Sequence, residues 1–415
     1  MRRRVWLVCT MGIAFTGCVL LSLSVRVLSI DGDANGGYQG WGDPELFRRI
    51  SREELRSRKT LARPLESTVD CDGMMHQQPT LPPTPDDALN FFTIGDWGVR
   101  GLSVGSDSQI SVARAMSCVA RSMPPKFIAT LGDNFYPVGV TSVEDKQFKA
   151  KFEEVYDDAS LHVPWFPVLG DHDHCGNVRA QSEYSRQSSR WTMPRAWYTQ
   201  YVNLPGGSGG TVQLIFVDWV ALEGKHTQVN GDRRFHDMLS HAAGLGTAEV
   251  HWEWLRRVTR KGRPTWRIVM GHRPLVSVSQ RSARDDLEYP AEARTRRAIR
   301  DLMESVEVDL WINGHDHTAQ VACSMKRRSA GSDLRGDHKV THFMTNGIGG
   351  YDLHAVRPEE EWPEETKYAN NTYHGFGVHH VTNESIKTYF VNDKGDVQHE
   401  FTIHKRHGSV QACSS

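Results

Sequence analysis

The sequence lacks a charge imbalance, an internal repeat and a second long apolar run. Its 49 Lys and Arg residues are matched by 50 Asp and Glu residues, which leaves a formal net charge of −1. A nearly neutral chain has no global field to attract nucleic acid or anionic lipid, so we predict no nucleic-acid partner. No fixed period repeats along the 415 residues, and we therefore expect no repeat architecture.

The long apolar run that is present extends from Val5 to Val25, directly after arginines at positions 2–4. Basic residues before an apolar run are typical of an export signal, and this run is also long enough to cross a bilayer. No small-x-small cleavage site follows it. Residues 1–30 are therefore predicted to be a signal peptide or a signal anchor. In either case the remainder is expected to be secreted or lumenal in the secretory pathway, with membrane attachment through residues 5–25 left open.

Cysteine is scarce, with seven residues in the chain. Two of them, Cys9 and Cys18, lie in the apolar run. The odd number that remains predicts up to two disulfides and one unpaired thiol in an oxidising compartment, among Cys71, Cys118, Cys175, Cys323 and Cys413. Asn370 and Asn383 begin N-x-S/T tripeptides and are candidate glycosylation sites.

The pattern of apolar residues divides the chain into four parts. Residues 31–86 are rich in Gly, Pro and charged residues and are predicted to be a linker or pro-segment; 87–405 form the folded domain, and 406–415 a tail. Strands are predicted at 90–94, 127–131, 166–169, 211–217, 267–270, 308–312, 340–345, 377–382, 387–391 and 401–404. Helices are predicted at 108–123, 142–155, 249–261 and 291–306, and surface loops at 220–248, 324–338 and 357–365. This alternation indicates an α/β fold with two packed sheets flanked by helices.

Five short segments place metal-binding side chains at or near the ends of predicted strands. They are Gly-Asp-Trp-Gly at 95–98, Gly-Asp-Asn-Phe-Tyr at 132–136, Gly-Asp-His-Asp-His at 170–174, Gly-His-Arg-Pro at 271–274 and Gly-His-Asp-His at 314–317. Loops that follow the carboxyl ends of strands gather at one edge of an α/β sheet, so we expect these segments to converge. Their oxygen and imidazole donors suit iron, manganese or zinc and are numerous enough to hold two metal ions.

In this order the segments resemble the purple acid phosphatases of the metallophosphoesterase superfamily, especially the small tartrate-resistant branch, from about residue 89 to 404. Most superfamily members begin with Asp-x-His, but here Gly98 stands where that histidine is expected. Purple acid phosphatases have a tyrosine in the second segment instead, and this chain has Tyr136 there. The resemblance implies a calcineurin-like sandwich of two mixed sheets, with residues 87–405 as its catalytic domain.

The resemblance also implies a ligand set: Asp96, Asp133, Tyr136, Asp171, His272, His315 and His317. Of these, Asp96, Tyr136 and His317 would bind a ferric ion, and Asp133 would bridge both metals. The other three would bind a second, divalent ion of iron, zinc or manganese. A phenolate is a hard anionic donor that favours Fe(III) and gives the family its charge-transfer colour. The implied activity is acid hydrolysis of phosphate monoesters by attack of a metal-held hydroxide.

Three positions near this ligand set bear on catalysis. His172 matches a family histidine that contacts phosphate or protonates the leaving group, and an imidazolium can do either. Asp173 is expected to orient neighbouring groups. A second family histidine is missing, and an ungapped count places Arg281 there, which can bind phosphate but cannot donate a proton.

Asp171 is the main departure, because the family has a neutral asparagine there. With a ferric and a divalent ion, three anionic ligands and one hydroxide, the family site keeps about one positive charge. An ionised Asp171 lowers this to about zero, which should weaken phosphate binding. A carboxylate can still bind a metal ion, so Asp171 remains a candidate ligand.

Alternative interpretations remain open at this stage. A catalytically impaired relative could serve as a lumenal, membrane-anchored scaffold, which Asp171, Arg281 and the N-terminal run favour. A phosphodiesterase of the wider superfamily is disfavoured by Gly98 and Tyr136. Outside the ligand set, several residues are expected to be surface or packing residues, namely His174, His226, His236, His379 and His380. Trp97 and Phe135 are expected to pack around the site, and Cys175 to be structural.

Overall fold

The computed structural model describes Cys71, Leu81 and residues 87–102, 106–207, 209–228, 248–288, 290–324 and 340–405. All of them belong to one compact unit that spans Asp43–Ser415. The predicted signal or anchor at 1–30, most of the predicted linker and the tail at 406–415 lie outside the described residues. No helix among the described residues combines the length and the apolar composition that a membrane crossing requires.

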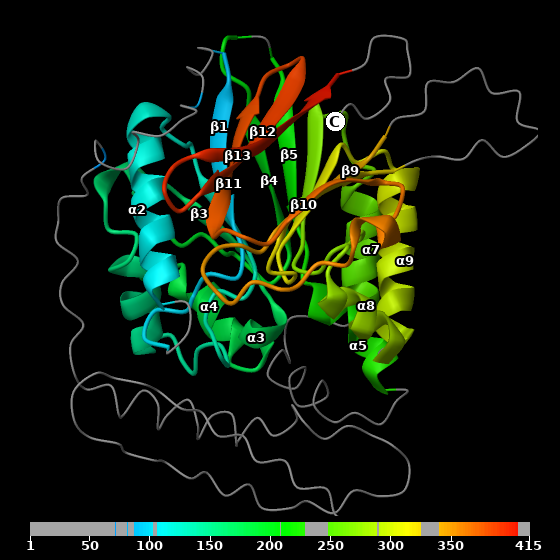
Figure 1. The fold of residues 1–415 in the computed structure, drawn as a ribbon, viewed down its shortest axis with the longest axis horizontal. Helices are drawn as coiled ribbons and strands as arrows, with labels where there is room; N and C mark the ends of the chain where they lie inside the picture. The colour runs from blue at the N-terminus through cyan, green and yellow to red at the C-terminus, as the bar shows by residue number, and fades with distance from the viewer. Residues whose placement is uncertain are drawn as a thin grey trace, which may run out of the picture. The chain divides into compact units, whose positions relative to one another are not determined.

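One sheet has six strands in the order β13-β12-β11-β1-β2-β3 (Figure 1). Strands β1, β2 and β3, at one side of this sheet, are parallel, and the remaining strands run antiparallel to their neighbours. Every residue of β1 and β2 is buried, which explains their mostly apolar sequences. The strands are β1 (Leu89–Ile94), β2 (Ile128–Leu131), β3 (Trp165–Val168), β11 (Gly375–Val381), β12 (Ser385–Asn392) and β13 (Val397–His404).

The other sheet has seven strands in the order β10-β8-β9-β7-β6-β5-β4. Its four middle strands β9, β7, β6 and β5 are parallel, and the outer strands pair antiparallel. The strands are β4 (Tyr198–Asn203), β5 (Thr211–Phe216), β6 (Trp266–Met270), β7 (Leu310–Asn313), β8 (Ala319–Cys323), β9 (His342–Asn346) and β10 (Thr366–Asn370). The predicted fold class, two packed mixed sheets flanked by helices, is confirmed.

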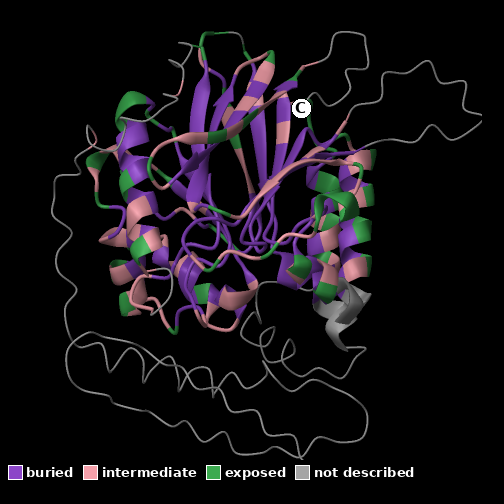
Figure 2. Cartoon of the chain, viewed as in Figure 1, coloured by how far each residue is buried: buried purple, intermediate pink, exposed green. Residues whose placement is uncertain are grey.

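Helices cover the outer faces of both sheets. Figure 1 shows α2 outside the six-stranded sheet and α7 and α9 outside the seven-stranded sheet, and Figure 2 shows that the exposed residues of these helices face outwards. Short helices α3 and α4 lie below β3. The helices are α2 (Ser106–Ser122), α3 (Asp171–His174), α4 (Val178–Tyr184), α5 (Trp219–Gln228), α7 (Ala248–Val258), α8 (Gln280–Glu288) and α9 (Pro290–Ser305).

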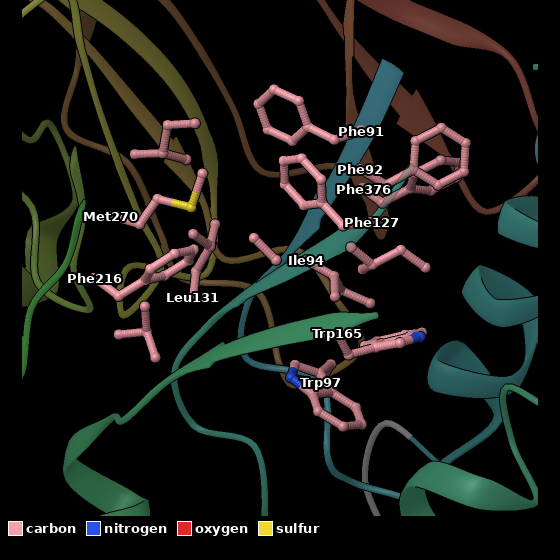
Figure 3. Packing of buried hydrophobic residues seen from close by; sticks show 14 of the residues in the cluster. Phe91, Phe92, Ile94, Trp97, Phe127, Leu131, Trp165, Phe216, Met270 and Phe376 are labelled. Atoms are coloured by element: carbon pink, nitrogen blue, oxygen red, sulfur yellow. The ribbon is translucent and has the colours of Figure 1, made fainter. Parts of the chain in front are cut away.

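The main core lies between the sheets (Figure 3). The rings of Phe166 and Phe216, one from each sheet, have centroids 5.8 Å apart. The amide of Asn346 on β9 donates to the backbone oxygen of Thr93 on β1 at 3.0 Å, which ties the sheets together next to the strand ends. Trp97 and Phe135 are fully buried with ring centroids 6.1 Å apart, as expected of packing residues.

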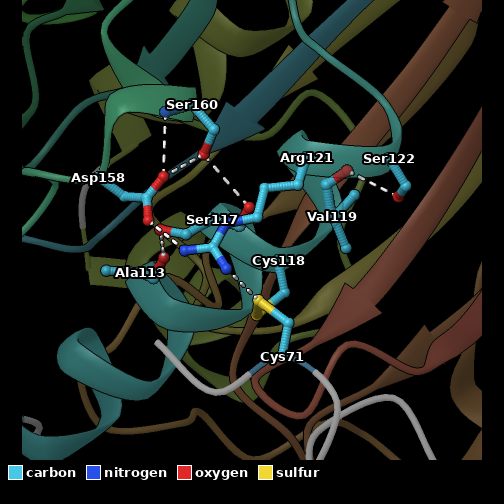
Figure 4. The surroundings of a disulfide bond; sticks show 9 residues. All are labelled: Cys71, Ala113, Ser117, Cys118, Val119, Arg121, Ser122, Asp158 and Ser160. Carbon is cyan, nitrogen blue, oxygen red and sulfur yellow. Dashed lines mark hydrogen bonds and ion pairs between the residues drawn. A yellow bond between two sulfur atoms is a disulfide. The ribbon is translucent and has the colours of Figure 1, made fainter. Parts of the chain in front are cut away.

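The cysteines agree with the expectation drawn from their odd count. Cys71 is joined by a disulfide to Cys118 on α2, near the ion pair of Arg121 with Asp158 at 2.6 Å (Figure 4). Cys323 is also disulfide-bonded. Cys175 remains a thiol. The Cys71–Cys118 bond fastens the segment before the domain to its first helix.

Several predicted elements were wrong or absent. The predicted helix at 142–155 is shorter in the structure: it contains a six-residue π-helix, Phe148–Glu153, and before it the Asp145 carboxylate accepts from the N–H groups of Thr141 and Gln147. The predicted loop at 220–248 begins inside α5. The sequence pattern also missed strands β4, β8 and β10 and helices α3, α4 and α8.

Candidate metal centre

The five predicted segments converge at the carboxyl ends of parallel strands from both sheets. Asp96 follows β1, Asp133 follows β2 and Asp171 follows β3 in the six-stranded sheet. His272 follows β6 and His315 follows β7 in the seven-stranded sheet. Neither sheet alone supplies the site, so the packing of the sheets is what assembles it.

One group of donors surrounds the phenol of Tyr136. Its hydroxyl oxygen lies 2.8 Å from Asp133 Oδ2, 3.1 Å from Asp96 Oδ1 and 3.2 Å from His317 Nε2. His317 Nε2 is in turn 3.3 Å from Asp96 Oδ1. The four side chains are 5% exposed or less. Four ligand-type atoms therefore point to one buried position.

A second group surrounds Asp171. Its Oδ1 lies 2.9 Å from His272 Nε2 and 3.1 Å from His315 Nδ1. The same His272 nitrogen is 3.4 Å from Asp133 Oδ1. Asp133 therefore has one carboxylate oxygen in each group. All seven residues that the sequence singled out as ligands are brought together, in two sets that share one carboxylate.

Backbone strain accompanies three of these residues. Asp96, Asp133 and His315 have φ of 58°, 51° and 66°, in the left-handed region that side chains other than glycine rarely adopt. Each such backbone conformation costs about 1–3 kcal/mol and is kept only where the surrounding structure holds it in place. Here the strained residues turn the chain out of a strand and aim the side chain into the site.

Gly132 shows how tightly the strand ends are packed. Its φ is 94°, and a Cβ placed on it would lie 2.4 Å from His272 Nδ1. That nitrogen faces the backbone oxygen of Leu131 at 2.8 Å, which fixes the ring with Nε2 towards the site. A side chain at position 132 would therefore displace His272.

Other contacts hold the donors in orientation. His317 Nδ1 is hydrogen-bonded to the backbone oxygen of Asp352. The backbone N–H of His315 donates to Asp96 Oδ2 at 2.9 Å. Tyr351 stacks on the ring of Tyr136 with centroids 4.2 Å apart. These contacts fix the donor atoms before any ion binds, as expected of a preorganised site.

Several donor side chains have shifted pKa values in the protein without bound metal. Burial, followed by the charges of Asp133 and Asp96, raises the pKa of Tyr136 well above its usual value. Burial would lower the pKa of His272, but Asp133 raises it well above the usual range, and Asp171 helps to raise that of His315 to about 9. Without other cations, protons on His272 and His315 therefore balance buried carboxylates, and the phenol of Tyr136 stays neutral.

Metal ions would replace those protons. Three carboxylates, three imidazoles and a phenol are hard or borderline donors of the kind that bind iron, zinc or manganese. Ligand atoms of Asp171, His272 and His315 all lie within 4.8 Å of one another, and so do those of Asp96, Asp133 and His272. The donor set thus fits a pair of cations.

The residues beside the ligands are also in place. The backbone N–H of His172 donates to Asp133 Oδ1 at 2.9 Å, and its ring lies 4.5 Å from that of Tyr136. Asp173 accepts from the N–H groups of Gly170 at 2.8 Å and Asn134 at 3.0 Å, so it braces the loops as expected. Burial and the charge of Asp133 raise the pKa of Asp173 to about 6.

Arg281, the residue counted to the missing family histidine, lies on α8 close to the ligands. Its Nε is 3.4 Å from Asp285 Oδ2, which is 3.6 Å from His315 Nε2. Arg273 was missed by the sequence reasoning, although it directly follows His272. Its guanidinium lies 4.0 Å from Asp171 Oδ2 and is paired with Glu292. The sequence signal that could have identified Arg273 was its position directly after the predicted ligand His272.

The residues predicted to be structural lie outside the donor groups. His174 is completely buried and pairs with Asp218 at 2.9 Å, so it is a packing residue and not a surface one. His379 lies in β11 between Thr93 and Thr388, 3.0 Å from each hydroxyl. His380 is also buried in β11. The side chain of His226 and residue His236 lie outside the described residues.

The chain matches known proteins over this same region. The model of the calcineurin-like phosphoesterase family matches residues 89–319. Mouse tartrate-resistant acid phosphatase type 5 is 32% identical over 283 residues, 68% of this chain and 78% of that protein. Purple acid phosphatase 7 of Arabidopsis thaliana is 29% identical over 331 residues, 77% of this chain and 88% of that protein.

Two solved structures share the fold. One, described as GAP50, the anchor in the inner membrane complex of Plasmodium, has a TM-score of 0.58 and 23% identity, over 77% of this chain and 90% of that one. The purple acid phosphatase PPD1 of yellow lupin has a TM-score of 0.53 and 15% identity, over 78% and 55%. Together with the geometry of the site, the sequence matches show that the chain belongs to the calcineurin-like phosphoesterases and, among them, to the purple acid phosphatases.

Proposed function

We propose that the protein is an acid phosphatase that hydrolyses phosphate monoesters at a dinuclear centre of one ferric and one divalent ion. The observation that carries the proposal is the arrangement of seven donors in two groups that share Asp133. The phosphatase relatives support a dinuclear centre for such a donor set.

The two groups suggest which residues hold which ion. Asp96, Tyr136 and His317 surround the position proposed for the ferric ion, where an anionic phenolate favours the higher charge. His272, His315 and Asp171 surround the position proposed for the divalent ion of iron, zinc or manganese. When bound, such a pair supplies positive charge to phosphate oxygens and lowers the pKa of water.

The protein's own groups position the substrate and handle protons. The carbonyl oxygen of Pro137 lies 2.5 Å from His172 Nδ1, so this nitrogen donates to it, and in the imidazolium form Nε2–H is left to donate to phosphate or to the leaving group. His172 is part-buried beside Tyr136, which places it at the rim of the donor groups. We propose His172 as the catalytic acid of the site.

Hydrolysis of an aryl phosphate by the purified protein, measured against pH together with iron content, tests this proposal. We expect iron in the protein and turnover that is highest at acid pH. Substitution of His172 by alanine should lower kcat while metal content is retained, because no donor is removed. Protein that contains iron and has no turnover at any pH would contradict the phosphatase proposal.

A second candidate is a metal-binding scaffold with impaired catalysis. Arg281 favours it, because a guanidinium in place of the family's second histidine cannot donate a proton, and so does the extra negative charge of Asp171. The fold neighbour described as a membrane-complex anchor is consistent with such a role but shares only the fold. A coloured, iron-loaded protein without turnover is the result that distinguishes the scaffold from the enzyme.

We also propose that residues 1–30 direct the chain into the secretory pathway as a cleaved signal or an uncleaved anchor, with 31–86 as linker and 87–405 as catalytic domain. The disulfides of Cys71 and Cys323 support an oxidising compartment. N-terminal sequencing of the mature protein tests the alternatives. A mature chain that begins near residue 30 indicates a cleaved signal, whereas an intact hydrophobic run recovered with membranes indicates an anchor.

A further inference from the structure

Asp171 and Arg273 lie close together beside the proposed divalent position. Arg273 directly follows the ligand His272, and one of its terminal nitrogens is 4.0 Å from Asp171 Oδ2. The side chain of Arg273 is 8% exposed and that of Asp171 is 18% exposed. Attraction between charges at this depth is screened far less than at the protein surface.

On its other side Arg273 contacts a charged cluster from the outer helices. It forms an ion pair with Glu292 of α9, and Glu292 is also 3.2 Å from Arg296 one turn further along the helix. Glu223 of α5 lies near the same guanidinium and is bonded to the indole N–H of Trp219. The cluster thus holds Arg273 between the metal loops and the helices.

Arg273 is placed to contact carboxylates on two sides. Glu292 is shared between Arg273 and Arg296. Asp171 is the carboxylate that Arg273 reaches beyond the helix cluster. In addition, Arg273 Nε is buried and has no hydrogen-bond partner among the described residues, so Glu292 does not satisfy the whole fork.

We infer that Arg273 is a positioning residue that offsets the charge of Asp171 and holds its carboxylate against His272 and His315. The inference rests on the proposed dinuclear site. An anionic ligand takes the place of the family's neutral one, and the adjacent guanidinium returns the positive charge that is lost. The pair thereby leaves the net charge seen by phosphate close to that of a site with a neutral ligand at position 171.

Arg273 changes the site charge expected from the sequence alone. Without Arg273, an ionised Asp171 lowers the site charge to about zero. With Arg273 included, about one positive charge remains, and phosphate binding is preserved as long as the pair is intact. Removing either partner alone should therefore change the site more than removing both.

A double-mutant cycle tests the pair in the full-length protein. Asp171→Asn, Arg273→Gln and the double variant are unfolded with urea in the presence of a chelator. We expect Arg273→Gln to raise the unfolding equilibrium constant at least about tenfold more in the wild-type background than in the Asp171→Asn background, a coupling of about 1.4 kcal/mol. Arg296→Gln is the matched control, because Arg296 pairs with the same Glu292, and its effect should be equal in both backgrounds.

Binding of orthophosphate to the metal-loaded variants gives a second readout. Arg273→Gln should weaken orthophosphate binding about tenfold, Asp171→Asn should strengthen it, and the double variant should bind about as the wild type does, because the two opposite charges offset each other. Equal effects of Arg273→Gln on unfolding in both backgrounds, or a double variant that binds orthophosphate as weakly as Arg273→Gln does, would overturn the inference.

Two outcomes that could confuse the test are separable. If Arg273→Gln does not fold alone, the double variant should fold, and a double variant that also fails overturns the inference. The chelated unfolding cycle needs neither metal nor turnover. Coupling in a protein that lacks phosphatase activity therefore supports the Asp171–Arg273 pair and contradicts the proposed function. Additive effects on unfolding in an active phosphatase contradict the pair and support the proposed function.

Discussion

Substitution of Gly132 by alanine should disrupt the metal centre, because the added Cβ would collide with the ring of His272. Gly132 has φ of 94°, and the added Cβ would lie 2.4 Å from His272 Nδ1 and 3.0 Å from the Cα of Gly170. A left-handed alanine costs about 1–2 kcal/mol. Overpacking of a tight interior adds about 1–3 kcal/mol. We therefore expect a loss of about 2–5 kcal/mol in the free energy of unfolding, together with displacement of the His272 ring.

Gly101 provides a matched control for the backbone term. Its φ is 90°, and a Cβ placed there would meet no atom of the described residues within 4 Å. Gly101→Ala should therefore show the left-handed strain without the collision, and it should retain its metal. Urea unfolding with a chelator measures the stability of both variants, and elemental analysis measures bound metal. Equal stabilities and equal metal contents for the two variants would refute the reasoning.

Three further predictions concern particular contacts. Asp171→Asn should raise orthophosphate affinity when Arg273 is present, because the site gains a positive charge; unchanged inhibition by phosphate would contradict this. His174 has a raised pKa, since Asp218 outweighs burial, and Asp218 has a lowered pKa despite its burial. The Asp218 contribution to stability is lost as pH falls through its folded pKa, and the His174 contribution is lost as pH rises through its own, so the pair stabilises most between about pH 4 and 6.5. Asp218→Asn should thus cost about 3–5 kcal/mol in that window and less above it, as urea unfolding at several pH values can show. Cys118→Ser opens a bond that spans 47 residues and should cost about 3–4 kcal/mol, whereas no loss of melting temperature would exclude a stabilising role.

The buried parallel strands could be predicted well from the sequence. β1, β2 and β3 are almost entirely buried, so their sequences are mostly apolar and end close to a glycine. In contrast, every residue of β10 is half-buried, and α8 is polar along most of its length, so neither leaves a clear apolar pattern. Tertiary packing, which a single segment does not record, determines those elements.

The candidate ligands could be singled out because they lie in short segments at or near recognisable strands, and because these segments resemble those of a known family. The residues that surround them could not, since their roles arise between distant segments. Arg273 acquires its role only when Glu292 and Asp171 are brought to it by α9 and by the loop after β3. Tyr351 stacks on Tyr136 although the two residues are far apart in the sequence, and no local sequence pattern predicts that contact.

The central claim is that Tyr136 binds a ferric ion within a two-metal centre. The most direct measurement is the visible absorption spectrum of the purified protein, together with elemental analysis, for the wild type and for Tyr136→Phe. We predict two metal ions per chain, at least one of them iron, and a charge-transfer band that disappears in Tyr136→Phe. A wild-type protein without iron, or a band that persists in the Tyr136→Phe variant, would contradict the account.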